Sequence, residues 1–265
     1  MPERTTREIL VFALTYPELS TKYRESACTG GVFMDSREWC RIYPLPVRFL
    51  DERVRRWSVI SARVWQEPGK DSRPESWRIE ADSIRVKRKI TTGNGRPPDW
   101  RERREIVFRA DRVFSTLEDL SAKQAADGTS LGIVRPREGA VVRIEERPPA
   151  DRREWESKLH LVVDQGDLLP GKRRPPALEY LSKRLKVRFR CPSDRCRGHN
   201  CVVLDWEICE LARREGWDAA REKVDTLLGS DYDTQFFMGN FNAHRRNFGI
   251  VGLWYPKRAR QGKLF

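Results

Sequence analysis

The sequence contains no long hydrophobic run. No stretch approaches about 18 consecutive apolar residues, which excludes a membrane-spanning helix. Residues 1–8 are polar and charged, and the apolar segment after them is too short for the core of a secretory signal peptide. We therefore expect a cytoplasmic protein whose six cysteines are reduced thiols.

Histidine is also scarce, with three in 265 residues. Metal-independent acid–base catalysis therefore has few candidate groups. Two catalytic motifs fail on context. Gly166–Lys172 has the spacing of a phosphate-binding loop, but Arg173 replaces the Ser or Thr that would hold magnesium. Gly128–Gly132 fits G-x-S-x-G, but it stands between an expected helix and an expected strand, the reverse of the hydrolase order. We identify no catalytic residue.

Positive charge is what the chain has in excess. Lys and Arg number 52 against 39 Asp and Glu, so the formal net charge is +13. A polyanion such as DNA or RNA is the partner that such a charge favours. A GC-rich genome, which raises the arginine content, and the solubility that a basic surface confers would explain the same excess without a partner. Although hydrophobic residues make up only 38%, 11 Phe, 9 Trp and 6 Tyr can build a folded core.

Short strand patterns dominate the first third of the chain. Apolar or alternating runs occur at residues 8–15, 39–43, 57–65 and 77–89, each bounded by turn-forming residues. Several short strands in one segment are typical of a small barrel. We predict a mainly β protein of the α+β class, with a first barrel over residues 1–95.

Helical spacing begins after that segment. Residues 96–128 are predicted to be a helical connector, with helices over 100–110 and 116–126, the second capped by Ser115. Residues 129–265 are predicted to be a second β module that contains a helical insertion at 204–229. The strands expected in this module cover residues 130–135, 140–145, 159–163, 185–190, 236–238 and 248–254.

Cysteines gather beside a histidine in the second module. Four residues separate Cys191 from Cys196, a spacing usual for zinc ligands at a turn, and His199 and Cys201 lie within the next five residues. We predict a structural zinc site of these four residues, in a turn over 191–201. Thiolates and an imidazole suit zinc, and the thiol-rich set resembles closed structural sites.

The fourth zinc ligand has alternatives. Cys209 or His244 could take the place of Cys201, and Asp205 and Glu207 are possible oxygen ligands. The two carboxylates also permit an alternative function, in which they lie near the metal of a nuclease-type enzyme. A third possibility is an adaptor that binds an acidic protein through its basic surface.

Basic and aromatic residues supply the candidate nucleic-acid contacts. Lys186, Arg188 and Arg190 alternate with apolar residues, so they should form the basic face of a strand backed by core. Aromatic rings would stack on bases or on arginine side chains. The predicted contact residues are Arg41, Tyr43, Arg48, Trp65, Lys87, Lys89, Lys172, Arg173, Arg174, Lys186, Arg188, Arg190, Arg245 and Arg246.

Short motifs over most of the chain carry a family resemblance. They are Thr15-Tyr-Pro17, Trp39-Cys-Arg-Ile-Tyr-Pro-Leu-Pro-Val-Arg48, Leu131-Gly-Ile-Val-Arg-Pro136, Cys191…Cys196…His199…Asp205-Trp-Glu207, Phe236-Phe-Met-Gly-Asn240 and Phe248-Gly-Ile-Val-Gly-Leu253. In these motifs the chain resembles the bacterial dual OB-fold domain proteins. The resemblance implies two OB-like barrels, a metal-binding insertion and a role in phage defence, and it brings no catalytic residues. We therefore expect a nucleic-acid-binding recognition or scaffold protein that works with protein partners.

Overall fold

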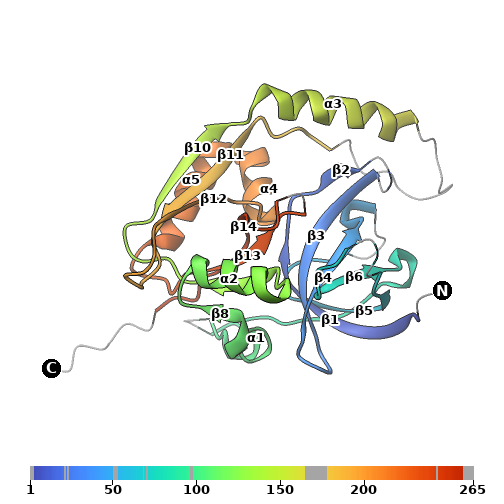
Figure 1. Ribbon diagram of the computed structural model, residues 1–265, viewed down its shortest axis with the longest axis horizontal. Coiled ribbons are helices and arrows are strands. Elements are labelled where there is room, and N and C mark those ends of the chain that lie inside the picture. Colours follow the sequence, from blue (N-terminus) through green and yellow to red (C-terminus); the bar gives the residue numbers. More distant parts are fainter. Residues whose placement is uncertain are drawn as a thin grey trace.

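A computed structural model describes residues 3–20, 22, 24–49, 53–67, 69, 71–95, 98–164, 178–242 and 244–258. These residues form a mixed structure, mostly strands with several helices, as the α+β prediction requires (Figure 1). Its first half is one curled sheet. The strands of this half are β1 (Thr5–Leu14), β2 (Glu18–Ser20), β3 (Arg24–Phe33), β4 (Trp39–Leu45), β5 (Ser58–Trp65), β6 (Ser76–Ile79) and β7 (Arg85–Lys89).

Five of these strands close into a barrel. The order is β1-β3-β4-β6-β5, and β5 pairs back onto β1. Neighbouring strands are antiparallel, except that β4 and β6 are parallel. The first predicted barrel is confirmed, and its topology is consistent with an OB-like barrel.

β1 explains why the sequence carries an unbroken apolar run near its start. Ile9 and Val11 point into the barrel interior, whereas Leu10 and Phe12 belong to a second core cluster outside it. That second cluster includes Phe237 and other residues of the second half of the chain. Because successive side chains of a strand alternate between faces, a strand between two cores is apolar at every position.

The second half contains two smaller sheets. One has the order β10-β11-β12 and the other β14-β13-β9-β8, with an isolated bridge between Val203 and Ile250. Pairing among the described residues closes only the first barrel, so the second OB-like barrel stays a prediction. The strands are β8 (Val113–Phe114), β9 (Leu131–Val134), β10 (Val141–Glu146), β11 (Lys183–Phe189), β12 (His199–Val202), β13 (Gln235–Asn240) and β14 (Phe248–Trp254).

The helices largely follow the predicted spacing. They are α1 (Arg101–Val107), α2 (Leu117–Asp127), α3 (Pro149–Asp164), α4 (Trp206–Glu215) and α5 (Trp217–Leu228). The cap of α2 is Thr116 rather than Ser115, because the Thr116 hydroxyl accepts the backbone N–H of Asp119. No helix in the described part of the chain is long and apolar enough to cross a membrane.

α3 corrects one predicted strand. Residues 159–163 continue a helix that starts at Pro149, so His160 is exposed on a helix and is not packed in a strand. Proline favours the first position of a helix. Ion pairs one turn apart, such as Arg152 with Glu156, then stabilise it. Figure 1 shows α3 lying along one side of the molecule, over the strands of both halves.

Candidate nucleic-acid interface and metal centre

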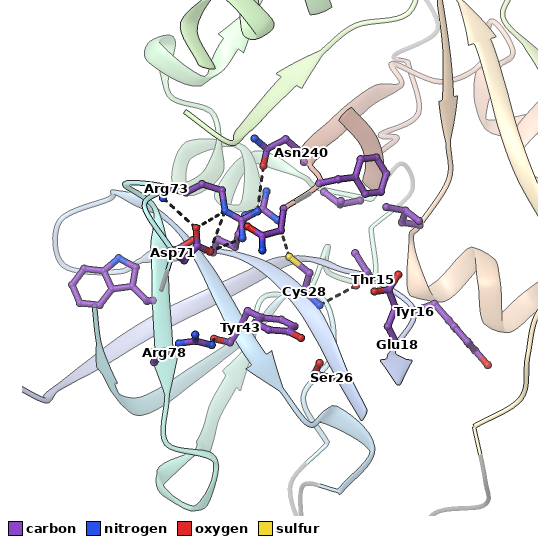
Figure 2. A pocket seen from close by; sticks show the side chains of 18 of the residues that line it. Thr15, Tyr16, Glu18, Ser26, Cys28, Tyr43, Asp71, Arg73, Arg78 and Asn240 are labelled. Atoms are coloured by element: carbon purple, nitrogen blue, oxygen red, sulfur yellow. Dashed lines mark hydrogen bonds and ion pairs between the residues drawn. The ribbon is translucent and has the colours of Figure 1, made fainter. Parts of the chain in front are cut away.

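A cavity of about 260 Å³ opens between the barrel and the second half; we call it the barrel-face cavity (Figure 2). Its barrel side comes from β2, β3, β4 and β6, and from the loops before β2 and before β6. Its other side comes from the segment around β13. Lining residues include Tyr16, Ser26, Cys28, Arg41, Tyr43, Asp71, Arg73, Trp77, Arg78, Asn240 and Phe241.

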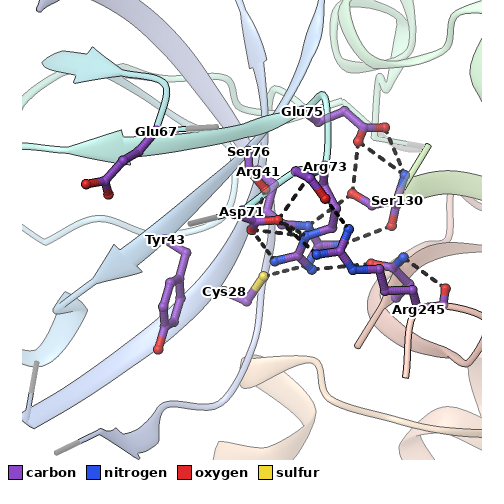
Figure 3. Close-up of polar contacts among 12 residues, drawn as sticks. Cys28, Arg41, Tyr43, Glu67, Asp71, Arg73, Glu75, Ser76, Ser130 and Arg245 are labelled. Atoms are coloured by element: carbon purple, nitrogen blue, oxygen red, sulfur yellow. Dashed lines mark hydrogen bonds and ion pairs between the residues drawn. The ribbon is translucent and has the colours of Figure 1, made fainter. Parts of the chain in front are cut away.

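Arg41 ties the two sides of this cavity together. Its guanidinium donates to the Cys28 sulfur at 2.8 Å and to the carbonyl and hydroxyl of Ser130 at 2.9 and 3.2 Å (Figure 3). Glu75 accepts the backbone N–H and the hydroxyl of Ser130, both at 3.0 Å. Arg41 is therefore buried, and each of its three guanidinium nitrogens already donates a hydrogen bond within the protein, so its position is that of a structural link rather than of the exposed phosphate contact that the sequence suggested.

The loop before β6 forms a charged rim. Asp71 accepts hydrogen bonds from Arg73 and Ser76, and Arg73 reaches across to the side-chain oxygen of Asn240 at 3.3 Å. Arg245, a predicted contact residue, donates to Ser72 at 2.7 Å on the same rim. Burial alone would raise the pKa of Asp71, but the hydrogen bonds from Arg73 and Ser76 lower it to about 2.

One polar atom of the cavity lining lacks a hydrogen-bond partner among the described residues. The hydroxyl of Ser26 is buried and has no hydrogen-bond partner among the described residues. Buried polar groups are normally bonded, so this hydroxyl is available to a ligand. Half-buried Tyr43 and Phe241 supply aromatic surface to the same cavity.

A basic groove of about 870 Å³ lies next to the cavity. Its basic residues are Arg184, Lys186, Arg197 and Arg246. Phe241 lines both hollows, so the barrel-face cavity and the basic groove adjoin. Glu145 lies 2.8 Å from Lys186 and 3.8 Å from Arg184 and offsets part of their charge.

The predicted strand face is present on β11. Leu185, Val187 and Phe189 are buried, whereas Arg188 is exposed and Lys186 is half-buried. Arg190 is exposed just beyond the strand.

Other predicted contact residues lie apart from both hollows. Arg48 pairs with Glu25 at 2.8 Å, and Trp65 stacks against Arg4. Lys87 and Lys89 are exposed on β7. The remaining ones, Lys172, Arg173 and Arg174, lie outside the described residues.

Three predicted metal ligands meet in the second half. The ligand atoms of Cys191, Cys196 and His199 all lie within 4.8 Å of one another, and the two cysteines are buried. The Cys196 sulfur accepts the backbone N–H of Cys191 at 3.0 Å and of Gly198 at 3.4 Å. Such donors stabilise a thiolate. We call these three residues the thiol–imidazole cluster, and residues 191–198 the knuckle loop.

The cluster has the donor chemistry that a zinc ion takes. Burial raises the pKa of the Cys191 thiol to about 12, although a hydrogen bond from the Leu117 backbone lowers it in part. A thiol in this position needs an adjacent cation to lose its proton near neutral pH. Two buried thiols and a half-buried imidazole, which the knuckle loop and the start of β12 bring together, fit zinc.

Cys201 does not join the cluster, contrary to the prediction. It lies two residues after His199 on the extended strand β12, which separates the two Cα atoms by about 6.6 Å. Its side chain is buried in the core of the second half. Among the alternatives, Cys209 is buried on α4 and His244 is exposed, and neither belongs to the cluster.

The carboxylate pair suggested for metal chemistry is used elsewhere. Asp205 is fully buried, caps α4 by accepting the N–H of Ile208, and pairs with Arg56 at 3.2 Å. Its carboxylate cannot reach a substrate. Glu207 is exposed and pairs with the same arginine at 3.0 Å.

Two known family domains match the chain, and the boundary between the two matches lies at η3 (Ala110–Arg112). Residues 113–265, more than half of the chain, match a domain of unknown function, DUF8757. The chain belongs to the DUF8757 family. Residues 5–109 match a second domain of unknown function, DUF8758. No curated protein and no solved structure matches the chain.

Sequence reasoning missed several residues that build the two hollows. Arg73, Asn240 and Phe241 lie in loops or at strand ends and carry no local pattern. Arg184 and Arg197 lie within the basic segments around the knuckle loop, so the local charge was their only signal.

Proposed function

We propose that this chain binds single-stranded nucleic acid across the barrel-face cavity and the basic groove. The observation that carries the proposal is that one residue, Phe241, lines both hollows, so that they are neighbours. OB-fold barrels bind oligonucleotides on their second and third strands and on two neighbouring loops. If the five strands of this barrel are matched to those of an OB fold, β3 and β4 are its second and third strands. Both strands line the cavity.

The two hollows have complementary chemistry. The cavity offers Tyr43 and Phe241 for stacking, which is worth about 1–3 kcal/mol per base in single-strand binding. The groove offers basic side chains for phosphates, and the buried Nε of Arg184 has no hydrogen-bond partner among the described residues. One base of a bound strand would thus lie in the cavity, and the phosphates of the same strand would lie along the groove.

We propose a structural zinc ion for the thiol–imidazole cluster. Ligands from the knuckle loop and β12 would fix the loop that carries Arg197 into the groove wall. With Asp205 committed to Arg56, we propose a recognition or scaffold role rather than an enzymatic one.

Anisotropy titrations with labelled single- and double-stranded DNA and RNA, across a salt series, test the nucleic-acid proposal. The double variant K186A/R246A removes two groove cations. For a single strand it should reduce the slope of log affinity against log salt by about 1.4 and weaken binding at low salt.

The matched control is K87A/K89A, which removes the same charge from β7, outside both hollows. It should keep the wild-type slope. An equal loss in both double variants would show non-specific attraction. No binding by the wild-type chain at low salt would overturn the proposal and favour an acidic protein as partner.

A further inference from the structure

Glu118, in the first turn of α2, reaches the thiol–imidazole cluster from a distant part of the chain. Its Oε2 atom lies 3.2 Å from Nε2 of His199. The Cys196 sulfur lies 3.2 Å from the same nitrogen. A thiol and a carboxylate thus converge on one imidazole nitrogen.

Hydrogen bonding does not account for this arrangement. Nε2 of a neutral imidazole carries at most one proton, so it can donate to only one of the two neighbours. Oε2 of Glu118 is buried and has no hydrogen-bond partner among the described residues. A buried carboxylate oxygen without a partner is costly, and a shared cation would satisfy it together with both thiolates.

The spacing agrees with a tetrahedral zinc ion. Bond lengths of about 2.0–2.2 Å to nitrogen and oxygen place those two ligand atoms about 3.4 Å apart, and sulfur and nitrogen about 3.6 Å apart. Both separations observed around His199 are 3.2 Å. Glu118 lies outside the group of ligand atoms that are all within 4.8 Å of one another, so its carboxylate would have to move closer to the cysteine sulfurs when a metal binds.

The local structure holds Glu118 in this place. Its other oxygen, Oε1, accepts the backbone N–H of Arg197 at 2.9 Å, which docks the carboxylate on the knuckle loop. The next residue, Asp119, pairs with Arg195 of the same loop at 3.4 Å. The Leu117 backbone bonds to the Cys191 thiol. The start of α2 thus packs directly on the loop.

We propose that Glu118 is the fourth ligand of the metal centre, which then has two thiolates, one imidazole and one carboxylate. This inference rests on the zinc centre proposed above. The metal would join α2 to the knuckle loop and β12, two consecutive segments that begin about 70 residues after Glu118. Since Glu118 and His199 both line the basic groove, the ion would stand in the groove wall.

Metal titration of the purified full chain tests the assignment, with zinc affinity measured by competition with a chromophoric chelator. E118Q should raise the zinc dissociation constant at least about tenfold, because loss of an outer-shell partner alone costs about 10- to 100-fold. D119N and C201S are the controls and should stay within about twofold of the wild type. Zinc binding by E118Q as tight as by the wild type would overturn the assignment, as would loss of zinc in C201S.

Cobalt spectra give an answer that does not depend on the stability of E118Q. Co²⁺ in the wild-type chain should show tetrahedral bands and charge transfer from two thiolates. E118C adds a third thiolate at the same position and should raise the charge-transfer absorbance by about half, in proportion to the thiolate count. An unchanged spectrum would place residue 118 outside the coordination sphere. A wild-type chain that binds neither zinc nor cobalt would overturn the zinc centre as well as the assignment of Glu118. The nucleic-acid proposal would not be affected, because the anisotropy titrations test it separately.

Discussion

Arg56 of the barrel and Asp205 of the second half form an ion pair that is almost fully buried. Nη1 and Oδ2 are 3.2 Å apart, and the two side chains are 2% and 0% exposed. Arg56 also donates to the backbone carbonyls of Phe12 and Leu253, one in each half. Burial raises the pKa of Asp205 to about 6, and Arg56 opposes that rise. The pair therefore holds the two halves in one relative position.

Replacing Arg56 should destabilise the whole chain. R56M leaves the Asp205 carboxylate buried without its partner, and breaking a buried pair in this way costs about 3–5 kcal/mol. Urea unfolding measures the loss. R88M is the control, because Arg88 forms an exposed pair with Glu102 and should cost less than about 1 kcal/mol. Equal losses in the two variants would contradict a structural role for the buried pair.

Acid should weaken the rim of the barrel-face cavity. The pKa of Asp71 is about 2 in the folded chain against an ordinary value of 3.8. The unfolded chain therefore binds this proton more tightly, and the stability that the ionised carboxylate contributes is lost as pH falls from about 4 to about 2. Thermal melts of wild type and D71N should show a stability difference that is constant above pH 4 and shrinks below it. A difference that stays constant down to pH 2 would contradict the pKa shift.

Removing metal should loosen the second half. Structural zinc couples binding to folding, so a chelator should lower the melting temperature of the wild-type chain, and added zinc should restore it. The same chelator already saturated with zinc is the control and should have no effect. C196S should melt lower from the start and should not respond to the chelator. A wild-type chain with an unchanged melting temperature would argue against a structural metal.

The sequence predicted correctly those features that depend on residues close to one another in the chain. Alternation along β11 placed Leu185 in the core and Arg188 outside because side chains alternate on any strand. The spacing of Cys191 and Cys196 predicted a shared site because a tight turn brings them together. Glu118 and Arg56 gave no such signal. Their partners lie far along the chain, and only tertiary packing brings them into contact.

Substitution of Ser26 should affect the stability of the chain and its binding of nucleic acid differently. Its buried hydroxyl has no partner in the described part of the chain, so S26A removes an unsatisfied polar group. The free energy of unfolding should stay the same or rise by up to about 1 kcal/mol. If the hydroxyl instead bonds a nucleotide in the barrel-face cavity, the same variant should bind single strands several-fold more weakly. Urea unfolding and anisotropy on one preparation measure both quantities. Weaker binding at unchanged stability would place the ligand at Ser26, whereas unchanged binding would move it out of the cavity and along the basic groove.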